Sequence, residues 1–136
     1  MGFLNSLLKK KDSKSPLDLL KEKADAAPND PKLQQDVATQ LKASGDLIGA
    51  HEYSRRSAQA HHKAGFAQKA AAVLKMSVAW GNPPPELMQD LVDTYLQLKL
   101  KEDARGALLQ LRKLQSNDRD ALARIDAKLT ELGPGR

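Results

Sequence analysis

Residues 61–74 read HHKAGFAQKAAAVL, and residues 95–108, which lie 34 positions further along, read YLQLKLKEDARGAL. In both stretches one apolar helical pattern ends at a short turn and a second begins directly after it. The same shift matches small and apolar residues: Ala70 with Ala104, Leu74 with Leu108 and Ala58 with Val92. Recurrence at a fixed spacing indicates a helical repeat.

Helix start and stop signals divide the rest of the chain in the same way. Ser15 and Asp30 each stand before a proline, which places a capping side chain ahead of a favoured first helical residue. Gly45 and Gly65 follow the ends of two further patterns, because glycine takes a positive φ angle without strain. The predicted helices span residues 16–27, 31–44, 46–63, 66–79, 85–98, 101–114 and 118–132.

These segments predict the fold class. No alternating apolar pattern longer than a few residues interrupts them, so strands are not expected. Short connections between helices of this length favour antiparallel packing of chain neighbours. We therefore expect an all-α protein of about six to seven antiparallel helices.

The composition of the 136-residue chain excludes several classes of protein. The absence of cysteine excludes disulfides, thiol nucleophiles and thiolate metal sites. The longest apolar run is far shorter than the ~18 residues that a membrane-spanning helix needs. No nucleophile elbow, phosphate-binding loop or zinc-protease motif is present. We therefore expect neither an enzyme nor a protein with a cofactor or metal.

Three turns share a pattern that resembles the tetratricopeptide repeat family over roughly residues 17–132. In that family a small residue lies five positions after the glycine that ends a first helix. The matching pairs here are Gly45 with Ala50, Gly65 with Ala70, and Lys99, in the glycine position, with Ala104. The family's tyrosine position, four before the turn glycine, holds Leu41, His61 and Tyr95. The resemblance implies a short right-handed solenoid of two to three divergent repeats.

The chain also departs from that family. Gly45 and Gly65 lie closer together than one full repeat, so the helix at 46–63 must close one helical pair and open the next. The aromatic residue expected early in a first helix is missing, and Gln34 and Met88 stand in its place. We expect the repeats to span residues 16–132, after a tail and linker at 1–15 and before a disordered tail at 133–136.

The net charge of +5 is concentrated in the middle of the chain. Residues 53–85 contain five Lys or Arg and no Asp or Glu. The resemblance implies a non-catalytic scaffold or adaptor that binds another protein in its groove, and a basic surface would suit an acidic partner. The candidate partner-binding residues are Arg55, Arg56, His62, Lys63, Lys69 and Lys75. Ordinary solvated helix charges are the alternative, and nucleic acid is disfavoured because no stacking aromatics lie among these residues.

The N-terminus offers a second candidate site. Phe3, Leu4, Leu7 and Leu8 share one face if this segment is helical, and Lys9, Lys10 and Lys11 follow directly. Such a segment could lie on an anionic membrane surface, dock into a partner, or pack on the open edge of the repeats. The alternative function is therefore a peripheral membrane adaptor. We expect a cytoplasmic protein, which in that case is held at the inner face of the membrane.

Histidines and aromatic residues have structural rather than chemical roles in this interpretation. His51 and His62 lie about 16 Å apart along one helix, too far to share a metal ion. His61 is expected between helices and His62 in solvent. We expect Phe66 and Tyr95 in the core, and Trp80 packed under the turn formed by residues 83–85.

Overall fold

In the computed structural model, which describes residues 14–134, the chain forms seven α-helices and no strand among those residues. The all-α prediction is confirmed, and every helix boundary lies within two residues of its predicted position. The helices are α2 (Pro16–Ala26), α3 (Pro31–Ala43), α4 (Leu47–Lys63), α5 (Ala67–Ala79), α6 (Pro85–Gln97), α7 (Lys101–Leu114) and α8 (Arg119–Leu132).

Capping side chains explain why four of these helices begin where they do. Ser15 Oγ accepts a hydrogen bond from the Asp18 backbone N–H at 3.1 Å, and Asp30 Oδ1 accepts from that of Leu33 at the same distance. Asp46 and Asp118 cap α4 and α8 in the same way. Each cap satisfies a backbone N–H that has no partner within its helix.

The three turns that define the repeat pattern have the same backbone geometry. The residue at the glycine position has a positive φ angle at Gly45 (91°), Gly65 (84°) and Lys99 (61°). In each turn the next residue donates its backbone N–H to the carbonyl five positions earlier, at 2.8–2.9 Å. The small residues that follow, Ala50, Ala70 and Ala104, are completely buried.

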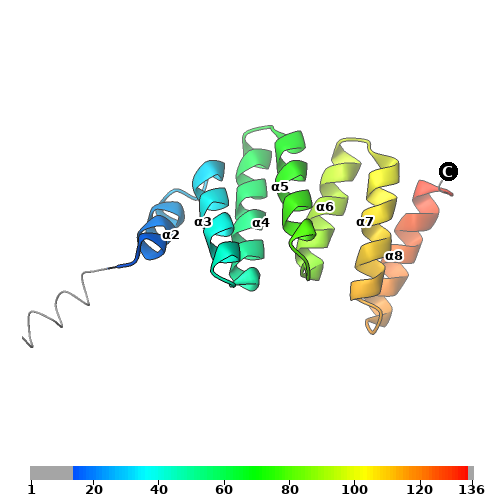
Figure 1. Cartoon of the computed structure of the whole chain (residues 1–136). Coiled ribbons are helices and arrows are strands. Elements are labelled where there is room, and N and C mark those ends of the chain that lie inside the picture. The colour runs from blue at the N-terminus through cyan, green and yellow to red at the C-terminus, as the bar shows by residue number, and fades with distance from the viewer. Residues whose placement is uncertain (1–13, 135–136) are drawn as a thin grey trace, which may run out of the picture.

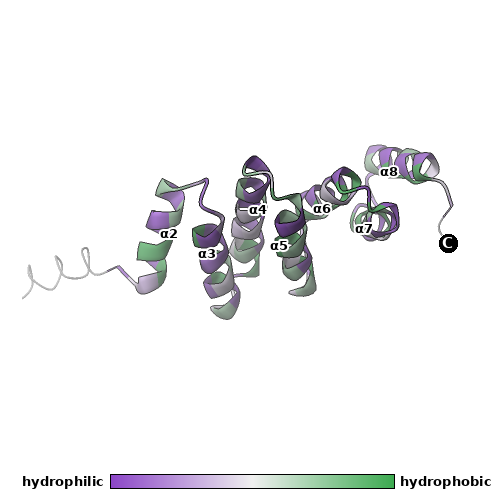
Figure 2. Cartoon of the chain, turned by 90° about the horizontal axis from the view of Figure 1, so that it is seen from above, coloured by the Kyte–Doolittle hydropathy of each residue, from purple (hydrophilic) through white to green (hydrophobic). Residues whose placement is uncertain are grey.

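Consecutive helices pack side by side in a single row (Figure 1). Viewed from above, α4, α6 and α8 lie along one side of the row, and α3, α5 and α7 along the other (Figure 2). Among the described helices, α4 and α6 are not consecutive but also touch, far less extensively than chain neighbours do. This arrangement is that of a short solenoid-like stack and not of a closed bundle.

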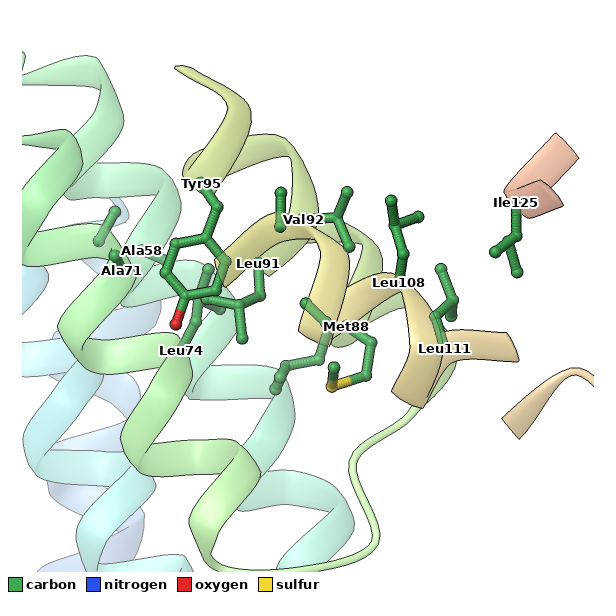
Figure 3. Close-up of a cluster of buried hydrophobic side chains, with 14 residues drawn as sticks. Ala58, Ala71, Leu74, Met88, Leu91, Val92, Tyr95, Leu108, Leu111 and Ile125 are labelled. Atoms are coloured by element: carbon green, nitrogen blue, oxygen red, sulfur yellow. The ribbon is translucent and has the colours of Figure 1, made fainter. Parts of the chain in front are cut away.

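Two hydrophobic cores hold the stack together, and α4 contributes to both. Ala50 and Tyr53 of α4 belong to an N-terminal core with residues of α2 and α3. Ala58, on the same helix, belongs to a C-terminal core that extends from α5 to Ile125 of α8 (Figure 3). The prediction that this helix closes one pair and opens the next is therefore confirmed.

The structure corrects one predicted core residue and confirms another. Tyr95 is buried in the C-terminal core, as expected. Phe66 is not in the core: half of its surface is exposed, because it stands at the residue before α5, where its side chain lies outside the helix contacts. The Lys69 ammonium lies 4.5 Å from the centre of its ring. Trp80 is half-buried and packs against the N-terminal core.

Candidate partner-binding groove

A run of cavities follows the face of the stack that α2, α4, α6 and α8 share. The α2–α4 cavity has a volume of about 340 Å³, and the α4–α6 cavity about 350 Å³. Two further cavities of about 290 and 430 Å³ lie between α6 and α8. Neighbouring cavities share lining residues, namely Gln59, Gln89, Asp90, Asp93, Gln115 and Arg124. They therefore form one groove, whose lining combines amide and charged side chains with apolar ones, such as Val92, Leu96 and Ile125 between α6 and α8.

The six candidate partner-binding residues come from two different helices. Arg55, Arg56, His62 and Lys63 come from α4 and line the groove. Lys69 and Lys75 are exposed on α5 and line none of these cavities. These residues therefore do not form one continuous basic surface.

Acidic residues from other parts of the chain neutralise the arginines of the groove. Arg55 Nε donates to Asp90 of α6 at 2.6 Å, and a second guanidinium nitrogen contacts the other carboxylate oxygen at 3.4 Å. The hydrogen bond with Asp90 raises the pKa of the Arg55 guanidinium above its usual value. Arg56 donates to Asp25 of α2 at 2.9 Å and lies 3.4 Å from Glu52.

Tyr53 and Arg56 together attach α2 to α4 at one end of the groove. The Tyr53 hydroxyl donates to Asp25 at 2.8 Å, and the Arg56 guanidinium lies 4.4 Å from the centre of the Tyr53 ring. Burial, and then the hydrogen bond with Asp25, raise the pKa of Tyr53 above its usual value. Lys63 adds a second link at this end, since its ammonium donates to Asn29 Oδ1 at 3.2 Å.

His62 is half-buried and bonded within the groove, whereas the sequence predicted a fully solvated side chain. Thr94 Oγ1 donates its proton to the Asp90 carbonyl at 2.8 Å and so must accept from His62 Nε2–H, 2.9 Å away. In the neutral ring this bond leaves Nδ1 as an acceptor beside the α4–α6 cavity. His61, as expected, lies partly buried, and its Nδ1 is enclosed without a hydrogen-bond partner. Burial, with Lys69 and His62 adding to it, lowers the pKa of His61.

A buried serine–histidine pair was not predicted from the sequence. Ser77 Oγ lies 2.6 Å from His51 Nδ1, and His51 Nε2 lies 2.8 Å from the Gly81 carbonyl. A carbonyl only accepts, so Nε2 carries the proton, and in the neutral ring Ser77 therefore donates to Nδ1. Both side chains are almost completely buried, and a backbone carbonyl stands where a catalytic carboxylate would be. The pair is a structural link between α4 and the end of α5.

Gln34, which stands where the tetratricopeptide pattern expects an aromatic residue, makes hydrogen bonds that the sequence did not predict. It is completely buried, and its Nε2 donates to the carbonyls of Ala24 and Ala27 at 2.7 and 3.1 Å. Both carbonyls also accept a backbone N–H, Ala24 from Ala27 at 3.1 Å and Ala27 from Asp30 at 3.0 Å, so Gln34 adds a second hydrogen bond to each and ties α3 to the end of α2. Its Oε1 has no hydrogen-bond partner, and Gln34 lines the α2–α4 cavity.

The N-terminal candidate residues, Phe3, Leu4, Leu7, Leu8, Lys9, Lys10 and Lys11, lie outside the described residues. The helices within residues 14–134 are all too short or too polar to cross a membrane. The same residues contain no group of three or more metal-ligating side chains. A scan against protein-family models finds no match, and neither does a search of curated proteins.

Proposed function

We propose that this chain is a non-catalytic protein-interaction scaffold of the tetratricopeptide type, which holds a partner protein in the groove of α2, α4, α6 and α8. The observation that supports the proposal most directly is the continuity of the groove, because adjacent cavities share lining residues. A groove of this kind lets an extended segment or a helix of a partner bury surface over several repeats.

The lining chemistry suits a partner of mixed polarity better than a purely acidic one. Asp25 offsets the charge of Arg56, and Asp90 offsets that of Arg55, so the groove presents neither arginine as an unpaired cation. The amides of Gln59, Gln89 and Gln97 add uncharged donors and acceptors along the groove. Recognition therefore depends on hydrogen bonds spread along the groove and less on long-range attraction.

Two variants with the same change in charge test this proposal. Gln59→Arg with Gln97→Arg places two cations in the α4–α6 cavity, whereas Gln68→Arg with Gln110→Arg places them on exposed positions of α5 and α7. Immobilised full-length chains are used to capture proteins from native lysate, and mass spectrometry quantifies them. Partners should be retained by the wild type and the α5/α7 variant and lost by the groove variant. Equal retention by both variants contradicts the proposal.

A peripheral membrane adaptor remains the alternative function, and it rests on the amphipathic and basic pattern of residues 1–11. Sedimentation with vesicles of anionic phospholipid tests it. Binding by the full chain that is lost on deletion of residues 1–13 supports the membrane function. Binding that survives the deletion, or no binding at all, rules it out.

A further inference from the structure

The turns that lead into α5 and α7 each place an apolar residue where a helix usually begins with a polar one. Phe66 and Leu100 stand at the N-cap positions, and neither side chain makes a hydrogen bond that caps its helix. Serine, threonine, asparagine and aspartate are favoured there, because their side chains accept a backbone N–H. Phe66 and Leu100 are 50% and 42% exposed, so core packing does not explain them. Both helices therefore lack a side-chain cap and carry an exposed apolar residue instead.

The two turns have the same geometry and lie on the same edge of the stack. The φ and ψ angles are −108° and 65° at Phe66, and −95° and 76° at Leu100. Phe66 donates its backbone N–H to the His61 carbonyl at 2.8 Å, and Leu100 donates to that of Tyr95 at 2.9 Å. The connections from α4 to α5 and from α6 to α7 are on one edge (Figure 1). One flat surface can therefore contact both apolar side chains.

Lysines flank both apolar residues. Four exposed lysines lie within three positions of them along the chain, namely Lys63, Lys69, Lys99 and Lys101. The Lys69 ammonium lies over the Phe66 ring, 4.5 Å from its centre. Glu102 and Asp103, in the first turn of α7, offset two of the four charges. The four lysines together with Phe66 and Leu100 form what we call the turn edge, which is apolar at two points and positively charged around them.

We propose that the turn edge docks on a membrane surface that contains anionic phospholipid. Phe66 and Leu100 enter the headgroup layer, and the lysines contact lipid phosphates. A bilayer matches this edge because it has an apolar layer beneath a flat, anionic surface. Neither apolar residue lines the cavities of the groove, so a partner held there leaves them exposed. The proposal goes beyond the scaffold function and is independent of residues 1–11, since the turn edge belongs to the helical stack.

A fluorophore at the turn edge tests where the protein meets the membrane. The chain has no cysteine, so a single introduced cysteine is labelled specifically. Leu100→Cys in the full-length chain carries nitrobenzoxadiazole, whose emission increases in apolar surroundings. Leu109→Cys, an exposed position on the same helix, is the matched control. Vesicles of phosphatidylcholine and phosphatidylserine should increase the emission at position 100 and not at position 109. The label decides the proposal, because residues 1–11 are a separate candidate anchor.

Serine substitutions separate membrane docking from folding. Phe66→Ser with Leu100→Ser removes both apolar side chains and supplies a favoured N-cap residue to α5 and α7, so the melting temperature should stay the same or rise. The affinity for anionic vesicles, measured by sedimentation of the full chain, should fall at least about tenfold. Met76→Ser with Leu109→Ser removes two exposed apolar side chains elsewhere on the same helices. This control should leave the affinity unchanged.

Three results overturn the membrane docking of the turn edge. These are an emission at position 100 that vesicles do not change, equal changes at positions 100 and 109, and a vesicle affinity that survives both serine substitutions. The first result is also the one expected if this edge receives an acidic protein instead of a bilayer. None of the three affects the capture of a partner in the groove, which the Gln59→Arg with Gln97→Arg variant tests separately.

Discussion

Ser77 donates a hydrogen bond to His51 Nδ1 at 2.6 Å, and so joins the last turn of α5 to the first turns of α4. The second ring nitrogen of His51 continues the link to the Gly81 carbonyl, at the turn that leads to α6. The ring of Trp80 lies near this link, with its centre 6.4 Å from that of His51. The His51 side chain thus links α4, the end of α5 and the turn that leads from α5 to α6.

Ser77→Ala should lower the free energy of unfolding by about 1–3 kcal/mol, because it leaves a buried ring nitrogen without a donor. Urea denaturation followed by circular dichroism measures the change. Ser116→Ala, at an exposed turn position, is the control and should have almost no effect. The double variant His51→Leu with Ser77→Ala should cost less than the sum of the two single variants. Additive costs would show that the bond contributes little.

Acidification should destabilise the protein through His61. The pKa of His61 is lowered in the folded state, by burial and then by Lys69 and His62, so the unfolded state binds the proton more readily. This contribution is fully present above the ordinary histidine pKa of about 6.5 and is lost as the pH falls through the lower folded pKa. Urea denaturation at a series of pH values measures the slope, and His61→Gln should reduce it.

Lys69→Met separates the causes of that shift. Removal of the nearby ammonium should move the pKa of His61 back toward its ordinary value, without restoring it fully, because burial is the larger cause. An NMR titration of the imidazole protons reports the pKa directly. An unchanged pKa in Lys69→Met would show that this charge does not act on His61.

Lys99→Gly should stabilise the protein by about 0.5–1 kcal/mol. Lys99 has a φ angle of 61°, which costs an ordinary residue free energy and costs glycine none. Gly65→Ala, at the equivalent position of the preceding repeat, should destabilise by about 1–2 kcal/mol for the same reason. Thermal unfolding measures both. Gln110→Gly, in the exposed middle of α7, is the control and should destabilise by about 1 kcal/mol.

Asp90→Asn should lower the free energy of unfolding by about 1–2 kcal/mol, because it breaks a half-buried pair with Arg55 that links α4 to α6. The side chains of this pair are 26% and 29% exposed, whereas Lys32 and Asp36 are 84% and 43% exposed. Asp36→Asn should therefore cost at most about 0.5 kcal/mol. Urea denaturation compares the two variants, and equal costs would contradict the role given to burial.

The sequence was sufficient to predict the helices because their signals are local. Ser15, Asp30 and Gly45 act within one turn of the chain, and the structure places caps or positive φ angles at these residues. The repeat period could also be predicted, because residues 34 positions apart have similar surroundings in the stack. Phe66 was misplaced because an apolar residue next to a turn has the same pattern whether its side chain lies in the core or outside it.

The groove could not be predicted in the same way, because its contacts depend on the stacking of distant segments. Asp90 lies 35 residues after Arg55, and Asp25 lies 31 residues before Arg56. A window of sequence that contains only the cations therefore indicated a basic surface, whereas the folded chain pairs Arg55 and Arg56 with acidic residues from other segments. The unmet oxygen of Gln34 depends in turn on where the carbonyls at the end of α2 come to lie.

The placement of α4 in both cores makes the two ends of the molecule interdependent. Removal of α2 and α3 would expose Ala50 and Tyr53 to water, and removal of the helices after α4 would leave Ala58 uncovered. Truncation on either side of α4 therefore strips part of a hydrophobic core of its cover.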